Sequence, residues 1–399
     1  MNQFTPKVRF IVMSDIHTKE DPECRQLQRL KKGLTEAYAY AEKCEYNKID
    51  AFFAVGDFTD DGAEQEMLNF KAVMDEYIKP ETDITLALAS HEYGATEPVA
   101  KERLSRIFGM HYDAHKVING FHFISVSCTQ GCHFKEPQIE FAAKALDEAF
   151  ADNQEAPIFF FQHPHIQGTV YGNIYWGEDE LNTTLMNYPQ VIDFSGHSHA
   201  PINDPRSIHQ YHFTSLGTGS LSYFELDEFD KVYGTVPPDA KNCAQFLIVE
   251  ADENNRVRIM PYDILTGRFF PYTWKIDTPS DPSTFIYTDE RYKTDVKPHF
   301  NPGTPIEVTT ENNETVVTFG QADIAEDRVN DYNIMIRNSN NKIFRKACIW
   351  SGYYLYDMPE KLSVTFKDLP AGKYTAEVVA AGFWHNQSDN TLKAEFSII

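Results

Sequence analysis

The pattern that most constrains the fold is a short apolar run that ends abruptly in aspartate or histidine. Runs of this length and composition are typical of buried strands. Five of them occur in the first half of the chain, ending at Asp15 with His17, at Asp57, at Ser90 with His91, at His163, and at His197 with His199. Because ligands gather at the carboxyl ends of strands in open α/β sheets, these side chains are expected to converge.

Segments with helical spacing of apolar residues lie between the strands. Residues 22–46 carry leucines at such a spacing, and residues 63–78 and 137–150 are predicted as two further helices. This alternation of strand and helix predicts a layered α/β domain. Further strands are predicted at 209–216, 243–250 and 257–262, with a hairpin at 117–126.

The His197-Ser198-His199 stretch is a candidate metal site, and the alternative is a pair of ordinary polar loop histidines. On an extended backbone the two imidazoles can lean to one side of a loop, and the small Gly196 and Ser198 allow close approach to an ion. Neutral imidazole is a good ligand for Zn, Fe, Mn or Ni. Residues of the other motifs have ordinary alternative roles as well. Asp15 and Asp57 could be helix caps, and His163 could be a core histidine.

The order and spacing of these motifs resemble the calcineurin-like metallophosphoesterases over residues 8–265. The family pattern runs Asp-x-His, Gly-Asp-x-x-(Asp), Gly-Asn-His-(Asp/Glu), a His and Gly-His-x-His. The resemblance implies a four-layer α/β/β/α sandwich. It also implies a phosphomonoesterase or phosphodiesterase that uses a di-metal centre and metal-bound hydroxide.

The resemblance assigns a role to each ligand residue. It implies two divalent or trivalent ions, Mn, Fe or Zn. The first would be held by Asp15, His17 and His199, the second by His163 and His197, and both by Asp57.

The third motif departs from the family pattern. Ala89-Ser90 stands where the family has Gly-Asn, so Ser90 would replace an amide oxygen on the second metal with a shorter and poorer ligand. The resemblance places His91 beside the leaving group and Glu92 as the acid that orients it. The departure leaves an alternative open, a degenerate binding module with one metal or none.

Residues near the expected rim are candidates for substrate contact. His91, Tyr93 and His165 are predicted to touch substrate, and Asp60 to support the ligands. Aromatic side chains of the rim could stack on a base or sugar, or could simply pack, and these are Tyr171, Trp176 and Tyr223.

The composition changes after Lys275. We predict a metallophosphoesterase domain over 1–276, a Pro-, Asp- and Thr-rich linker over 277–305 and a small β-sandwich over 306–399. The turn at residues 369–374 resembles fibronectin type III-like modules. The expected strands are 314–319, 331–337, 362–369, 374–381 and 391–396.

Charge and composition bear on partners and compartment. A net charge of −23 argues against a nucleic-acid backbone or an anionic membrane as partner, although bound cations would still permit a small phosphorylated substrate. No transmembrane run or signal-peptide core is evident, which favours the cytoplasm, or secretion if a leader has been removed. The pair Cys128 and Cys132 could bridge or bind metal, but free thiols are expected because no second pair completes a zinc site.

Overall fold

The computed structural model describes residues 3–94, 96–325 and 327–399, and their contacts divide the chain into two compact units. The first unit comprises Met1–Asp227 and Asp239–Asp289, and the second comprises Glu228–Pro238 and Glu290–Ile399. The predicted linker is therefore shared between the two units. A short excursion at 228–238 joins the second unit. The three-part division of the sequence stays a prediction.

One sheet of the first unit is built around three parallel strands, β1 (Pro6–Met13), β2 (Ala51–Val55) and β3 (Asp83–Ala87). On the other side of β1 the sheet continues in antiparallel order through β12, β13 and β14, and β15 pairs with β13. The bounds of these strands are Gln245–Asp252, Val257–Asp263, Arg268–Phe269 and Trp274–Ile276. The parallel strands are almost entirely buried, as expected when both faces of a sheet are covered.

The second sheet has four parallel strands, β5, β6, β9 and β11, flanked by antiparallel edges β4 and β10. In chain order the bounds are β4 Ala114–Ile118, β5 Phe121–Ser125, β6 Ile158–Phe161, β9 Val191–Ser195, β10 Ile208–Gln210 and β11 Thr214–Gly217. The predicted hairpin is confirmed as β4 and β5. The single strand predicted over 209–216 is wrong, because the chain turns back within it to form β10 and β11.

Phenylalanine rings hold the two sheets face to face. Phe10 of β1 lies 5.2 Å from Phe123 and 4.8 Å from Phe159 of the opposite sheet, measured between ring centroids, in edge-on contacts. Such aromatic contacts add to the free energy gained by burial alone. The interior of the first unit is therefore a sheet-on-sheet core.

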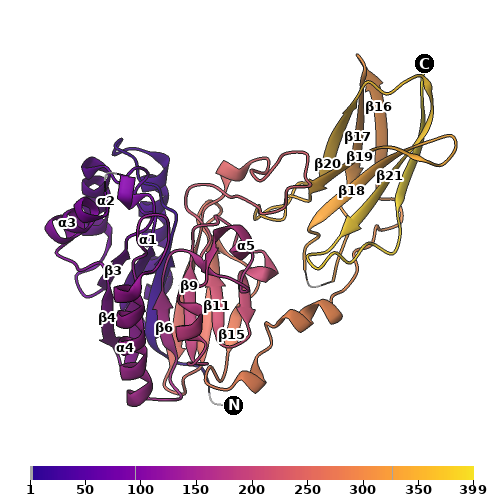
Figure 1. Cartoon of the computed structure of the whole chain (residues 1–399). Helices are drawn as coiled ribbons and strands as arrows, with labels where there is room; N and C mark the ends of the chain where they lie inside the picture. The colour runs from indigo at the N-terminus through magenta and orange to yellow at the C-terminus, as the bar shows by residue number, and fades with distance from the viewer. Residues whose placement is uncertain (1–2, 95, 326) are drawn as a thin grey trace. The chain divides into compact units, whose positions relative to one another are not determined.

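Helices cover the outer faces (Figure 1). α1 (Arg25–Glu42) and α2 (Glu64–Tyr77) bury their apolar sides against the first sheet, and α4 (Glu136–Asp152) packs on the second. This gives the four-layer α/β/β/α order. The smaller elements are α3 (Glu97–Arg103), a π-helical turn (Leu104–Phe108), β7 (His165–Ile166), α5 (Asn173–Trp176), β8 (Gly177–Glu178) and α6 (Asn182–Leu185). None of the helices in the described part of the chain is long and apolar enough to cross a membrane.

The second unit is built mainly of β-strands, with a 3-10 turn at Asp289–Lys293 near its start. A three-stranded sheet, β16-β17-β20, and a four-stranded sheet, β19-β18-β21-β22, enclose an apolar core. Their bounds are β16 Ile306–Glu311, β17 Glu314–Gly320, β18 Asp331–Asn338, β19 Ile343–Trp350, β20 Lys361–Lys367, β21 Gly372–Ala381 and β22 Leu392–Ile398. The predicted small β domain is confirmed, whereas its likeness to fibronectin type III modules stays a prediction.

Candidate metal centre

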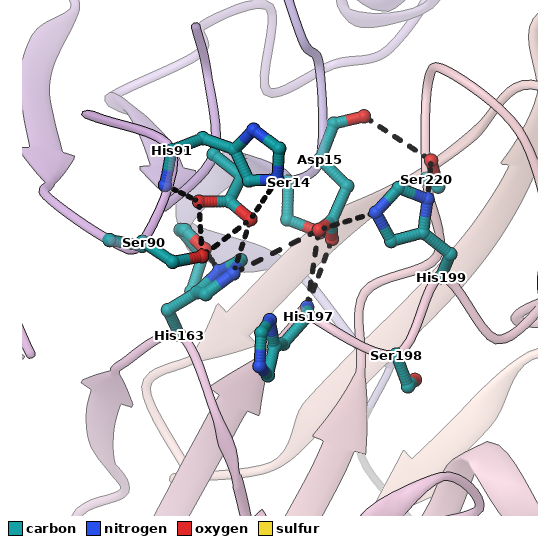
Figure 2. A network of polar contacts seen from close by, with 12 residues as sticks. Ser14, Asp15, Ser90, His91, His163, His197, Ser198, His199 and Ser220 are labelled. Carbon is teal, nitrogen blue, oxygen red and sulfur yellow. Dashed lines mark hydrogen bonds and ion pairs between the residues drawn. The ribbon is translucent and has the colours of Figure 1, made fainter. Parts of the chain in front are cut away.

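The polar residues predicted to act together lie on loops that directly follow parallel strands of both sheets (Figure 2). Five of these residues share an unusual backbone conformation. The left-handed φ angles are 49° at Asp15, 54° at His17, 49° at Asp57, 70° at His197 and 55° at His199. A non-glycine residue in this region costs on the order of 1 kcal/mol or more, and such strain is concentrated at functional sites.

Two glycines let these loops approach one another. A Cβ on Gly56 would lie 2.4 Å from the His163 ring, and φ there is +82°. A Cβ on Gly196 would lie 2.5 Å from a carboxylate oxygen of Asp15. Both distances are below any real contact. The sequence therefore needs glycine at these positions so that side chains from distant strands can meet.

A first group of donor atoms comes from Asp15, His17 and His199, which lie within 4.8 Å of one another. The two Nε2 atoms of His17 and His199 are 3.1 Å apart, and Asp15 Oδ1 is 3.3 Å from His199 Nε2. The other ring nitrogen of His199, Nδ1, faces the Tyr223 carbonyl oxygen at 3.1 Å. Nδ1 therefore carries the hydrogen, and the lone pair on Nε2 points into the group.

A second group contains Asp57 and His163, which cluster with Asp15 in the same way. His163 Nδ1 donates to the Val55 carbonyl oxygen at 2.7 Å. Its Nε2 lies 2.9 Å from Asp57 Oδ2 but has no hydrogen-bond partner among the described residues. The His197 ring is next to it, with a centroid separation of 4.9 Å. A fully buried imidazole lone pair facing a carboxylate lacks only a cation between them.

The electrostatics of both groups fit metal ions. Asp15 and Asp57 are at most 1% exposed. Burial alone would raise the pKa of each, but His199 at Asp15 and His163 at Asp57 outweigh it and hold both pKa values well below the usual range. Burying two carboxylates together is costly unless positive charge accompanies them. Carboxylate oxygen and imidazole nitrogen are suitable donors for Zn, Mn or Fe.

Ser90 and His91 lie beside Asp57. The Ser90 hydroxyl donates to the Asp57 carboxylate at 3.3 Å, and the His91 backbone N–H donates to the same group at 3.0 Å. The His91 ring is 43% exposed, its Nδ1 contacts the Asp60 carbonyl oxygen, and its Nε2 is 4.0 Å from Asp57 Oδ2. Asp60 also lies 3.5 Å from His17 Nδ1, which agrees with its predicted supporting position.

The structure corrects the predicted contact between Glu92 and His91. Glu92 is fully buried. Its carboxylate accepts hydrogen bonds from the backbone N–H groups of Asp57, Thr59 and Ala89 at 2.8–3.0 Å, and from the Thr59 hydroxyl. Burial and the nearby Asp57 charge raise its pKa to about 7. Glu92 thus fixes the loop that carries Asp57 and does not orient the His91 ring.

Tyr93 and His165 are also placed differently from the predicted substrate contacts. Each is 1% exposed. The Tyr93 hydroxyl donates to the Cys128 carbonyl oxygen at 2.6 Å, and the His165 ring is held between the hydroxyls of Ser195 and Ser198. Burial lowers the pKa of His165 to about 3. Both side chains support the loops from within.

The aromatic candidates of the rim are divided. The ring centroid of Trp176 is 5.0 Å from that of His197, and the centroid of Tyr223 is 4.3 Å from that of His199. Both rings are half-buried and border the centre. Tyr171 instead faces the guanidinium of Arg206, 4.0 Å from its ring centroid.

The sequence raised Cys132 only as half of a possible pair with Cys128, for which free thiols were favoured over a metal site. All six cysteines are free, as expected. However, Cys132 lies within 4.8 Å of donor atoms of both His163 and His197. Hydrogen bonding with Cys128, opposed by burial and aided by His197, lowers the pKa of the Cys132 thiol to about 4. The only signal in the sequence was its spacing from Cys128, which does not reveal proximity to the histidines.

Comparisons with known proteins bear on the first unit. Residues 8–201 match the family model of calcineurin-like phosphoesterases, and the predicted α/β/β/α fold class is confirmed. The structure of a purple acid phosphatase from yellow lupin (Lupinus luteus) seeds is 16% identical, and the match covers 68% of this chain and 55% of that chain with a TM-score of 0.49. The chicken CNTN1 FN1–FN3 domains are 12% identical over 38% of this chain and 47% of that chain, with a TM-score of 0.20. The search of curated proteins found no match.

Proposed function

We propose that this chain, whose residues 8–201 match the calcineurin-like phosphoesterases, is a metal-dependent hydrolase of phosphoric esters with a di-metal centre. The observation that carries the proposal is the pair of buried carboxylates facing imidazole lone pairs that lack a cation. His163 Nε2 is the clearest case, because its other nitrogen is already committed to Val55.

The donor groups suggest how two ions would be held. Asp15, His17 and His199 would hold the first ion, His163 and His197 the second, and Asp57 would serve both. When bound, two such ions neutralise charge on the phosphoryl oxygens and make water acidic enough to act as a nucleophile at neutral pH. They would also reverse the local field of a chain whose net charge is −23, so that an anionic ester can enter.

His91 is the side chain best placed to serve the leaving group. Its Nδ1 is engaged by the Asp60 carbonyl oxygen and must carry a hydrogen there, so Nε2 is the atom left to face the substrate. The ring is partly exposed, whereas the side chains of His17, Asp57 and His163 are buried. A proton or hydrogen bond from Nε2 to the departing alkoxide would lower the barrier to hydrolysis. Such assistance typically raises the rate by about 10²–10⁴-fold.

The rim supports a small substrate. Trp176 and Tyr223 flank the histidines of the centre and offer apolar surface to the group attached to the phosphate. Trp176 is fixed by a hydrogen bond from its Nε1 to Asp227 at 3.0 Å. A small phosphorylated molecule is therefore the substrate class proposed, as monoester or diester.

The proposal is tested with chromogenic phosphate monoesters and diesters. The protein loaded with Mn²⁺ or Zn²⁺ should hydrolyse at least one of them, lose the activity on treatment with a chelator and regain it when metal is returned. Full turnover after complete metal removal would contradict the proposal. Two bound ions without turnover on either ester class would favour the binding-module alternative instead.

A further inference from the structure

The second group of donor atoms contains a cysteine sulfur in addition to the histidine nitrogens. Cys132 is 4% exposed, and its sulfur and one nitrogen each from His163 and His197 all lie within 4.8 Å of one another. His163 contributes an independent sign of a ligand, because its Nε2 is fully buried and has no hydrogen-bond partner among the described residues. The group that faces it, 2.9 Å away, is the Asp57 carboxylate, which would hold the same ion. The three side chains thus surround a point where a cation would satisfy all of them.

The topology explains why these three residues meet. β5, β6 and β9 are adjacent parallel strands of the second sheet. The loop after β5 carries Cys132, the loop after β6 carries His163, and the loop after β9 carries His197. Neighbouring strands therefore deliver one donor each to the same edge.

A tight turn holds Cys132 in place. The Thr129 N–H donates to the His133 carbonyl oxygen at 2.7 Å, and the Cys132 N–H donates to the Thr129 carbonyl oxygen at 3.0 Å. The φ angle of Cys132 is 60°, in the same left-handed region as five other residues of the centre. The neighbouring Cys128 differs, because its thiol donates to the Leu88 carbonyl oxygen at 3.8 Å and it stands in none of the donor groups described above.

We propose that Cys132 is a thiolate ligand of the second metal ion. This inference rests on the proposed function and refines the composition of the centre. Ser90, at the position where the family pattern has asparagine, uses its hydroxyl on the Asp57 carboxylate. The ligand set of the second ion is then Asp57, His163, His197 and Cys132.

A thiolate changes which ion the second site prefers. Soft sulfur together with imidazole favours Zn²⁺ and Co²⁺ over Mn²⁺ and Mg²⁺, whereas the first group offers only nitrogen and oxygen. The two sites should therefore differ in selectivity. Zn²⁺ should fill the second site ahead of Mn²⁺ when both are present.

Titration of the metal-free, reduced full-length protein with Co²⁺ tests the inference directly. Thiolate bound to Co²⁺ gives a near-ultraviolet charge-transfer band that imidazole and carboxylate ligands do not give. The wild type should develop this band in proportion to one bound ion out of two. Cys132→Ser should lose the band and bind one of its two ions about 10–100-fold more weakly. Cys243→Ala, the matched control, removes another buried thiol of the first unit that stands in none of these donor groups, and it should keep both the band and the affinity.

The outcomes separate this inference from the proposed function. Two Co²⁺ ions bound by the wild type without the charge-transfer band would overturn the thiolate ligand while leaving the hydrolase proposal intact. Persistence of the band in Cys132→Ser would do the same. If Cys132→Ser does not fold, the wild-type spectrum still decides. A protein that shows the band but hydrolyses no ester would support the ligand and contradict the function.

Discussion

At the scale of single residues, the centre is defined by nitrogen atoms whose tautomers are fixed from outside. The Nδ1–H groups of His163 and His199 donate hydrogen bonds to the carbonyl oxygens of Val55 and Tyr223. Both Nε2 atoms therefore face carboxylates. Outer contacts of this kind commonly change metal affinity by about 10–100-fold when removed. The arrangement leads to a prediction for Asp57, the carboxylate proposed to serve both ions.

Asp57→Asn should abolish hydrolysis and reduce the bound metal while leaving the fold intact. The amide keeps the shape of the side chain but loses the charge that would serve both ions. Metal content, turnover and circular dichroism measured on the same sample provide the check. Asp113→Asn, which alters a half-buried carboxylate bonded to the Ser127 N–H, is the control and should keep both ions. Wild-type activity with two ions in Asp57→Asn would contradict the assignment.

Asp193 provides a prediction about pH and stability. It is fully buried, and burial raises its pKa from 3.8 to about 8 although Gln162 donates to it. The folded chain therefore keeps this proton up to about pH 8, whereas the unfolded chain loses it near pH 3.8. The stability due to this group is fully present below pH 3.8 and is lost as pH rises to about 8.

Asp193→Asn removes this pH-dependent loss. We expect the free energy of unfolding of the variant, relative to wild type, to rise between pH 5 and pH 8 by on the order of 1–3 kcal/mol. Urea unfolding at the two pH values measures it. Asp75→Asn changes an exposed carboxylate, 63% accessible, and should show no such trend. A difference that stays constant with pH would show that Asp193 is ionised in the folded state.

The sequence singled out the clustered donor residues because their motif order resembles a family pattern, but it could not establish which neighbours are buried. Glu92, Tyr93 and His165 are adjacent to ligands and chemically suitable, yet each points into the loops and away from solvent. Cys132 shows the reverse error. Its distance from the histidines depends on strand order in the sheet, which no local pattern encodes.

At the scale of elements, the long helices and the parallel strands other than β11 were predicted well because each carries a strong apolar pattern. β19 was missed since the first half of Ile343–Trp350 is largely exposed and polar, which weakens the alternation. The division of 209–216 into β10 and β11 was missed because the chain reverses within a stretch that reads as one strand. Loops at the strand ends carry the donor side chains, and these loops can approach one another closely only because Gly56 and Gly196 lack a Cβ.

Gly196→Ala should displace Asp15. The added Cβ would lie 2.5 Å from an Asp15 oxygen and 2.7 Å from the Ser14 hydroxyl oxygen, whereas the φ of Gly196 carries no left-handed strain. Shifts of about 1 Å in a catalytic group can cost on the order of 10²-fold in rate. Turnover should therefore fall by about 10–100-fold.

Gly217→Ala is the matched control for this loss of turnover. It adds the same methyl group in β11, where the nearest atoms are 3.7 Å away or farther. Its kinetics and melting temperature should stay close to wild type. Equal activity of Gly196→Ala and Gly217→Ala would show that the loop accommodates a methyl group at residue 196, and it would contradict the predicted displacement of Asp15.

At the scale of the whole molecule, the two units are not consecutive in sequence. The excursion 228–238 belongs to the second unit, although the residues before and after it belong to the first. Within the second unit, Lys231 Nζ lies 3.1 Å from Asp331 Oδ2, the Val232 N–H donates to the Cys348 carbonyl oxygen, and the Tyr354 hydroxyl donates to the Pro238 carbonyl oxygen. Residues up to Asp289 group with the first unit instead, and the Tyr287 carbonyl oxygen accepts from the Gln210 N–H of β10.

A chain that ends at Asp289 should therefore fold and melt cooperatively, because the core of the first unit is complete. Its excursion 228–238 loses the anchors Asp331, Cys348 and Tyr354, so limited proteolysis should cut there and spare the same segment in the full chain. A chain that ends at Asp277 also loses Tyr287 and should melt at a lower temperature. Insoluble protein without a native-like melt in both cases would contradict the boundary.

The most direct test of the central claim is turnover of a chromogenic phosphate ester measured against metal bound per chain. Metal-free protein is titrated with Mn²⁺ or Zn²⁺, and bound ion and rate are followed on the same sample. The di-metal account predicts little turnover with one ion and full turnover only as the second binds. Full turnover with one ion or none, or no turnover with two, would contradict it.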